Sequence, residues 1–133
     1  MKGFRFKDNK AKVLTLEIEG EKYTFIPNTY EVRNAIEFFN KRNDQIRNKL
    51  SKKATEKELA DSNLKLLNLC ESTVNAILGK GTYRKIFAGR SVSLDENEEL
   101  LSYIFTSITE FCNKEADRMK NEKHTHNKAA EIN

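Results

Sequence analysis

Residues 73–91, with the sequence TVNAILGKGTYRKIFAGRS, hold three of the chain's five glycines and lie between two long amphipathic stretches. Gly79 follows two apolar residues at a point where a glycine in the left-handed conformation would end a helix. Gly89 marks a second end. Between these glycines, three apolar residues are spaced as on one face of a short helical turn: Tyr83, Ile86 and Phe87. The stretch therefore predicts a junction that docks on longer helices, not a catalytic loop.

The composition favours a small helical protein. Its 133 residues suffice for one domain with a modest core. A third of the residues are charged, 38% are hydrophobic and proline occurs once, a balance typical of helical folds and not of all-β folds. The net charge of +4 arises from 24 basic and 20 acidic residues, so it reflects a slight excess and no strong basic field.

The sequence shows no membrane segment. No apolar run approaches the roughly 18–20 residues needed to cross a bilayer. The N-terminal stretch MKGFRFKDNKAK also lacks the apolar core of a signal peptide. We therefore expect a cytoplasmic protein without a membrane partner. Cys70 and Cys112 lie at apolar positions of predicted helices, and we expect both to be buried, reduced thiols.

Alternation of apolar and polar residues over about residues 12–27 predicts a β-hairpin. A two-residue turn at Gly20–Glu21 would place four apolar side chains on one face, in the pairs Ile18–Tyr23 and Leu16–Phe25. An isolated hairpin is marginally stable in water. Its apolar face must therefore cover the helices, a third strand around Phe4 and Phe6, or a neighbouring subunit.

Three long helices are predicted after the hairpin, over about residues 29–50, 55–78 and 95–120. Each begins at a pair of residues with capping-box spacing: Asn28 with Glu31, Thr55 with Glu58, and Asp95 with Glu98. The short linker at 51–54 favours an antiparallel pair of the first two helices. The sequence thus predicts a mainly α (α+β) fold, a single domain over residues 1–122, and a disordered tail over residues 123–133.

Some apolar residues lie outside the stripes that one neighbouring helix would cover. Leu64 and Leu67 widen the apolar face of the second long helix, and Tyr103 lies off the face of the third. We expect the second helix to be central in the fold or partly at an interface, and the extra residues are candidates for self-association or partner contact. Ordinary core packing is the alternative for each of them.

The search for chemistry gives no catalytic, cofactor or metal site, and we expect no enzyme. The two histidines, His124 and His126, lie in the predicted tail without a third ligand nearby. No Ser-His-Asp or Cys-His arrangement can form in the predicted domain without histidine. The run Gly79-Lys80-Gly81-Thr82 follows a helix, whereas a phosphate-binding P-loop follows a strand.

Two groups of basic residues keep nucleic-acid binding open as an alternative. One group surrounds the linker between the first two helices. The other lies in the glycine-rich junction, where Tyr83 and Phe87 alternate with the basic residues. The groups are Lys49, Lys52, Lys53 and Lys57, and Lys80, Arg84, Lys85 and Arg90. Acidic residues interrupt the basic ones nearly everywhere else, which makes such a function the less favoured interpretation.

The junction ILGKGTYRKIFAGRS, followed about a turn later by LLSYIFTSI, resembles that of tail assembly chaperones from siphophages and prophages of Gram-positive bacteria. Members of that family also open with a strand pattern FxxxGxxYxxxP, matched here from Leu16 through Gly20 and Tyr23 to Pro27, with Leu16 at the first position. Order and spacing agree over about residues 12–112, although Lys80 stands where an acidic residue is expected.

This resemblance implies a protein that binds and solubilises the tape measure protein in the host cytoplasm and gives way to tail tube subunits. It would be absent from the mature virion. The candidate contact residues for the client or for self-association are Leu16, Ile18, Tyr23, Phe25, Leu64, Leu67, Tyr83, Ile86, Phe87 and Tyr103. A small phage nucleic-acid-binding or regulatory protein and a structural tail or head-tail component stay open as alternatives.

Overall fold

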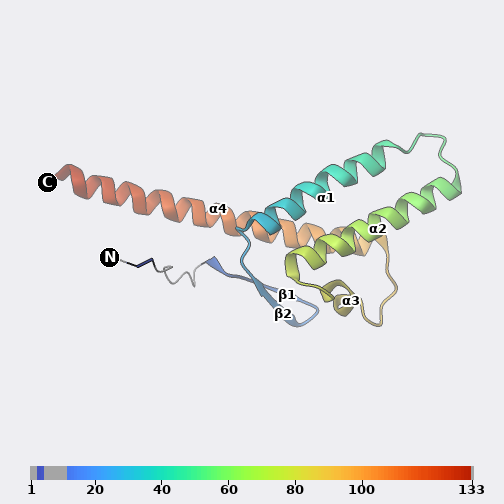
Figure 1. Cartoon of the computed structure of the whole chain (residues 1–133), viewed down its shortest axis with the longest axis horizontal. Helices are drawn as coiled ribbons and strands as arrows, with labels where there is room; N and C mark the ends of the chain where they lie inside the picture. Colours follow the sequence, from blue (N-terminus) through green and yellow to red (C-terminus); the bar gives the residue numbers. More distant parts are fainter. Residues whose placement is uncertain (1–2, 5–11, 133) are drawn as a thin grey trace.

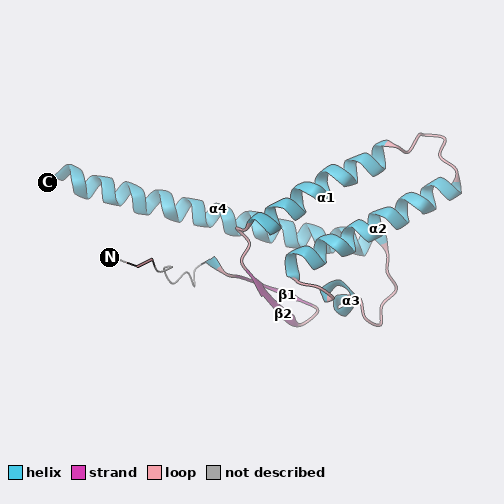
Figure 2. Ribbon diagram, in the orientation of Figure 1, coloured by secondary structure: helices cyan, strands magenta, loops and turns pink. Residues whose placement is uncertain are grey.

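A computed structural model describes residues 3–4 and 12–132. A two-stranded antiparallel hairpin is followed by helices, which confirms the predicted mainly α (α+β) class (Figure 2). In chain order the elements are β1 (Leu14–Ile18), β2 (Glu21–Phe25), α1 (Tyr30–Asn48), α2 (Glu56–Leu78), α3 (Thr82–Ile86) and α4 (Leu94–Ile132).

The predicted register of the hairpin is wrong by two residues. Leu16 lies opposite Tyr23, and Leu14 lies opposite Phe25. The turn residues are Glu19–Gly20, whose φ angles of 50° and 78° are both positive. Hairpins favour such turns because their twist matches that of the strands, and glycine at the second position adopts the conformation without strain. Because side chains alternate with a period of two, the shift leaves the same residues on the core side.

No third strand joins the hairpin within the described part of the chain. Phe4 is 80% exposed, and Phe6 lies outside the described residues. The apolar face of the hairpin is covered by the helices, since Leu16 and Ile18 join the main core together with residues of α1, α2, α3 and α4.

Helix α2 is the central element, which is one of the two positions that its wide apolar face left open. It packs antiparallel to α1 and also contacts α3, α4 and β2 (Figure 1). The fully buried Val74 and Ile104 bring α2 and α4 together. A second, smaller core holds α1 and α2 together towards their linker and consists of Ile46, Leu66 and Leu69.

The N-cap of α1 lies one residue later in the chain than the sequence predicted. Thr29 accepts a 3.2 Å hydrogen bond from the backbone N–H of Val32, so Thr29 is the N-cap. Asn28 instead accepts a 2.7 Å hydrogen bond from the Arg33 guanidinium. Asn and Thr are both good N-caps, so the predicted cap Asn28 is wrong by one residue.

The cap of α2 is as predicted, and that of α4 is not. Thr55 accepts a 3.2 Å hydrogen bond from the backbone N–H of Glu58 and donates to its carboxylate. At α4 the cap is Ser93, whose hydroxyl accepts a 3.2 Å hydrogen bond from the backbone N–H of Glu96. Asp95 therefore lies inside the first turn, where its negative charge interacts favourably with the helix dipole.

Helix α4 continues to Ile132, beyond the predicted end near residue 120 and through most of the predicted disordered tail over residues 123–133. The last glycine of the chain is Gly89 and its one proline is Pro27, so no residue breaks the helix once it has started. Figure 1 shows the C-terminal part of α4 projecting past the other elements. Residues 116–121 are exposed, which explains the absence of an apolar stripe there.

Among the described residues, no helix is both long and apolar enough to span a membrane. The same residues contain no group of His, Cys, Asp and Glu side chains that could hold a metal ion.

Candidate protein-interaction surfaces

Hydrogen bonds to buried side chains fix the glycine-rich junction in place. The backbone N–H of Tyr83 donates to the Asn75 side chain at 2.9 Å, which ties α3 to α2. The Tyr83 hydroxyl donates to Asn97 Oδ1 at 2.7 Å, and Asn97 Nδ2 donates to the Ser93 carbonyl at 2.7 Å. Burial raises the pKa of Tyr83. Sequence reasoning missed the structural role of Asn97, which is only 1% exposed.

Seven of the ten candidate contact residues pack in or against the core. In the junction, Tyr83, Ile86 and Phe87 are buried, as expected for a turn that docks on the longer helices. In the hairpin, two residues are buried and two are half-buried against the core: Leu16 and Ile18, and Tyr23 and Phe25. These residues position the hairpin and α4.

The remaining three candidates are more accessible. Leu64 on α2 is 59% exposed, Tyr103 on α4 is 43% exposed, and Leu67 is half-buried. The structure therefore leaves Leu64 and Tyr103 as the accessible apolar candidates that the sequence named.

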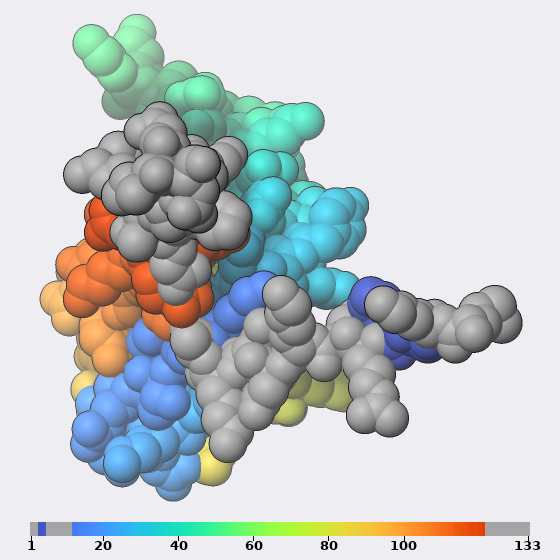
Figure 3. All heavy atoms as spheres, turned by 90° about the vertical axis from the view of Figure 1, so that its left-hand side faces the viewer, coloured from blue at the N-terminus to red at the C-terminus, as the bar shows by residue number. Residues whose placement is uncertain are grey.

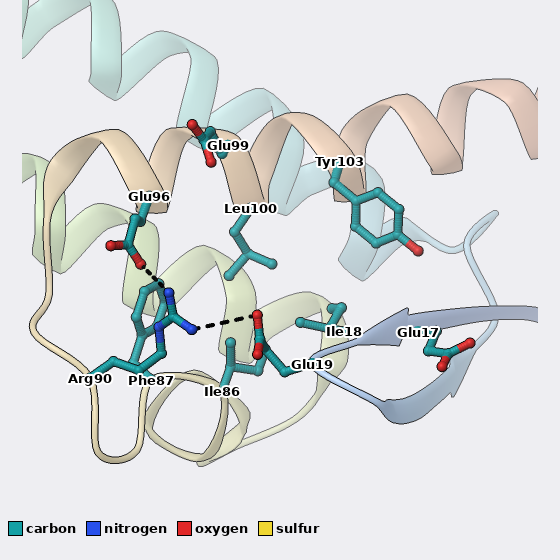
Figure 4. Close-up of a pocket in the computed structure, with 10 residues that line it drawn as sticks. All are labelled: Glu17, Ile18, Glu19, Ile86, Phe87, Arg90, Glu96, Glu99, Leu100 and Tyr103. Atoms are coloured by element: carbon teal, nitrogen blue, oxygen red, sulfur yellow. Dashed lines mark hydrogen bonds and ion pairs between the residues drawn. The ribbon is translucent and has the colours of Figure 1, made fainter.

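Tyr103 lines a groove between the hairpin, α3 and α4 with a volume of about 300 Å³, which we term the hairpin–α4 groove (Figure 4). Leu100, Ile18 and Ile86 point toward one another and form its apolar floor. Its rim is charged, and Arg90 crosses it with ion pairs of 3.6 Å to Glu19 and 2.9 Å to Glu96. The complete lining is Glu17, Ile18, Glu19, Ile86, Phe87, Arg90, Glu96, Glu99, Leu100 and Tyr103.

The charged rim continues along α4 as a second, shallower hollow that shares Glu99 and Tyr103 with the hairpin–α4 groove. Its other lining residues are Asp95, Glu98, Ser102, Thr106, Ser107 and Glu110. Together the two hollows are lined by seven acidic residues and one basic residue, Arg90. This face is therefore acidic on a protein whose net charge is +4.

A second groove runs between α1 and α2 and displays two aromatic side chains that the sequence analysis did not single out. Tyr30 is 78% exposed and Phe38 is 58% exposed. We define this α1–α2 groove by two adjoining hollows of about 430 Å³ and 270 Å³, which share Phe38 and Ser72. Between them, the hollows are lined by Tyr30, Glu31, Asn34, Ala35, Phe38, Arg42, Ile46, Lys65, Asn68, Leu69, Ser72, Thr73 and Ala76.

The spacing of Tyr30 and Phe38 could have revealed this face. They lie eight residues apart, close to two full helical turns, with Asn34 halfway between them, so all three project from one side of α1. The stronger stripe of Val32, Ile36 and Phe39 drew attention to the opposite, buried side.

Most basic residues of the junction are paired with acidic ones. Lys85 lies 2.6 Å from Glu21, and Arg84 lies 3.4 Å from Glu71. The Glu21 carboxylate raises the pKa of Lys85, which also lies over the Tyr23 ring at 5.8 Å. Arg90 is paired as described above. The junction therefore presents less positive charge than its sequence suggests.

The loop between α1 and α2 is basic, and its lysines have no acidic partners among the described residues. We term four exposed lysines the lysine tip: Lys49, Lys52 and Lys53 in this loop, and Lys57 in the first turn of α2. None of them forms an ion pair in the part of the chain that the structure describes. Figure 1 shows this loop at the far end of the α1–α2 hairpin.

The cysteines form no disulfide. Cys70 is buried, as predicted, whereas Cys112 is only half-buried. Desolvation raises the pKa of the Cys70 thiol to about 11, so little of it ionises near neutral pH. Its environment suits a packed core residue and not a nucleophile.

Comparisons with known proteins place the chain in a family but not beside any characterised member. No curated protein matches the chain, and no solved structure matches it. One family model matches residues 27–132, from the end of the hairpin to the end of α4. The chain therefore belongs to the family described as a family of unknown function, DUF6673.

Proposed function

We propose that this protein is a phage tail assembly chaperone that binds the tape measure protein and keeps it soluble during tail assembly. The resemblance over about residues 12–112 suggests this client. The observation that carries the proposal is the α1–α2 groove, where Tyr30 and Phe38 stay exposed over an apolar floor. Grouped, exposed aromatic side chains on a soluble protein are typical of a protein-binding surface.

The dimensions of the groove suit a helical segment of a client. From Tyr30 to Ile46 the axis of α1 extends by about 24 Å, a length that accommodates about four turns of a docked helix. The two aromatic anchors are about 12 Å apart, so apolar residues two turns apart on the client could contact both. Small side chains, Ala35 and Ala76, allow the client to approach closely between them.

The charges around the groove favour one orientation of the client. Glu31 lies at the Tyr30 end, while Arg42 and Lys65 lie at the Ile46 end. A client helix with a basic residue near Glu31 and an acidic residue near Arg42 would match both ends. Such complementarity selects among the many amphipathic segments of a long helical protein.

The alternatives receive less support from the described residues. A nucleic-acid-binding protein would use the two basic groups, but in the junction Arg84, Lys85 and Arg90 are paired with carboxylates. Among the described residues, this leaves only Lys80 and the lysine tip unpaired in these two groups. A structural tail component would remain in purified virions, whereas a chaperone that acts in the host cytoplasm would be absent from them. Mass spectrometry of purified particles therefore distinguishes a structural tail component from a chaperone.

The direct test is co-expression of the tagged chain with a tape measure protein from the same genome, followed by nuclease treatment and affinity purification. We expect the tape measure protein to be soluble and to co-purify. Phe38→Ala should lower its recovery strongly. Met119→Ala, which truncates an exposed apolar side chain on α4, is the matched control and should recover the client as well as the unaltered chain does. If both variants recover the client fully, or if both lose it equally, this groove is excluded as the binding surface.

A further inference from the structure

We propose that the lysine tip of one copy binds the hairpin–α4 groove of a second copy, so that copies of this protein associate head to tail. This inference is independent of the proposed client. It uses two surfaces that lie outside the α1–α2 groove.

The accepting surface combines an apolar floor with unpaired negative charge. Tyr103 is 43% exposed beside Leu100, where a partner side chain could cover it. Four carboxylates that line the groove or its continuation along α4 form no ion pair in the described part of the chain: Glu17, Asp95, Glu99 and Glu110. A partner that brings both apolar and basic groups would satisfy this surface.

The lysine tip supplies those groups. Its four lysines equal the four unpaired carboxylates in number, and three of them extend from a loop that holds the half-buried Leu50. Leu59, one turn into α2, is 44% exposed and adds apolar surface near this loop. The charge complementarity between the two surfaces therefore comes with apolar area on both sides.

Within one chain, Arg47 near the lysine tip pairs with Glu98 of the acidic hollow, but the hairpin–α4 groove lies at the other end of the molecule. Figure 1 shows the loop that carries the lysine tip at the end of α1 and α2 that points away from the hairpin. Figure 3, turned by 90°, again shows the green end of this helical pair at the top and the blue hairpin at the bottom. Because the views agree, the contact has to form between copies.

A contact between two different surfaces is heterologous, so it builds an open chain or a closed ring instead of a two-fold dimer. Lining residues of the α1–α2 groove end at Ile46 on α1 and begin at Lys65 on α2, outside the lysine tip. Each copy in such an assembly would therefore keep its α1–α2 groove accessible.

The association should depend strongly on salt. Each exposed ion pair contributes a factor of about two to three in affinity. Neutralising all four lysines should therefore weaken the contact roughly tenfold to a hundredfold. Raising the salt from about 0.05 M to about 0.5 M should have a similar effect, since screening shortens the range of the charges.

The test uses the purified full chain, without nucleic acid or client, in analytical ultracentrifugation at low salt. The unaltered protein should show concentration-dependent association. A tip variant has Lys49, Lys52, Lys53 and Lys57 each changed to Gln, and a face variant has Glu17, Glu99 and Glu110 changed to Gln and Asp95 to Asn. At a protein concentration where the unaltered chain is only partly associated, each variant should be monomeric. Circular dichroism and melting should match those of the unaltered chain, because every changed residue is exposed.

Mixing the two variants gives the decisive result. The tip variant keeps its groove and the face variant keeps its lysine tip, so the mixture should form a one-to-one dimer that grows no further. A monomeric unaltered protein at low salt would overturn the proposal. So would continued association of the tip variant, or a mixture that stays monomeric while the unaltered chain associates. Each readout concerns purified protein alone, so failure here leaves the client proposal to be judged by its own experiment.

Discussion

The Tyr83 hydroxyl donates a 2.7 Å hydrogen bond to Asn97 Oδ1, which lies fourteen residues later in the chain, and both side chains are buried. This bond joins α3 to the first turn of α4. Because the Tyr83 backbone N–H also binds Asn75, one residue connects α2, α3 and α4. The direction in which α4 returns across α2 is therefore set at Tyr83, and with it the width of the hairpin–α4 groove.

Tyr83→Phe should lower the free energy of unfolding by about 1–3 kcal/mol, since it removes the donor and leaves the buried Asn97 oxygen unsatisfied. Urea denaturation measures this change. Tyr103→Phe is the matched control, because Tyr103 is exposed and its hydroxyl has no partner in the described structure, and it should cost less than about 0.5 kcal/mol. Equal effects of the two variants would show that the Tyr83–Asn97 bond contributes nothing to stability.

Gly79→Asn should destabilise the protein more than Gly81→Asn. Gly79 has φ 117° and ψ 153°, a backbone conformation that glycine alone adopts readily, whereas Gly81 has φ 83° and ψ −5°, near the left-handed region that asparagine tolerates. The cost at Gly79 should be about 1–3 kcal/mol. Thermal or urea unfolding of both variants compares them directly, and a larger loss at Gly81 would contradict the prediction.

Stability should fall as the pH rises from about 9 towards 11, in part through Cys70. Burial raises the pKa of this thiol from 9.0 to about 11. Above pH 9 the unfolded chain loses the Cys70 proton while the folded chain keeps it, so the unfolded state binds fewer protons and stability decreases. The raised pKa of Tyr83 acts in the same direction.

The contribution of Cys70 is isolated by comparing urea unfolding of the unaltered chain and Cys70→Ala at several pH values. Cys70→Ala should be less stable throughout, because it leaves a small cavity, but its stability should fall less steeply above pH 9. If the unfolding free energies of the two proteins change with pH in parallel, Cys70 does not titrate as its burial requires.

The local patterns of this chain predict its elements well, and the errors come from choices between near-equal local solutions. The period-two alternation predicted the hairpin, and the period of 3.6 predicted the three long helices. The turn could form at Glu19–Gly20 or at Gly20–Glu21, and both place Leu16 and Ile18 on the same face. The two turns differ in which residues of the strands lie opposite each other, and the alternation alone does not distinguish them.

The accessible surface was harder to predict from the sequence. A stripe of apolar residues shows that a face is covered, but it does not show by what, so core residues such as Phe87 and exposed ones such as Tyr103 looked alike. Tyr30 and Phe38 were overlooked because they lie off the stronger apolar stripe of α1. Their significance appears only when α2 lies beside α1 and forms the floor between them.

The adjacent residues Phe38 and Phe39 offer the sharpest separation of stability from binding. Phe39 is half-buried and packs edge-to-face on Phe105 with ring centroids 5.4 Å apart, whereas Phe38 is 58% exposed in the α1–α2 groove. Phe39→Ala should cost about 2–4 kcal/mol of unfolding free energy, and Phe38→Ala less than about 0.5 kcal/mol.

Binding to the tape measure protein should show the reverse order. Phe38→Ala removes an anchor from the proposed contact surface, so client recovery should fall by roughly tenfold or more. Phe39→Ala, measured at a temperature where circular dichroism shows that it is folded, should retain the client because its side chain faces the core. If Phe39→Ala loses the client while folded and Phe38→Ala keeps it, the client binds elsewhere than in the α1–α2 groove.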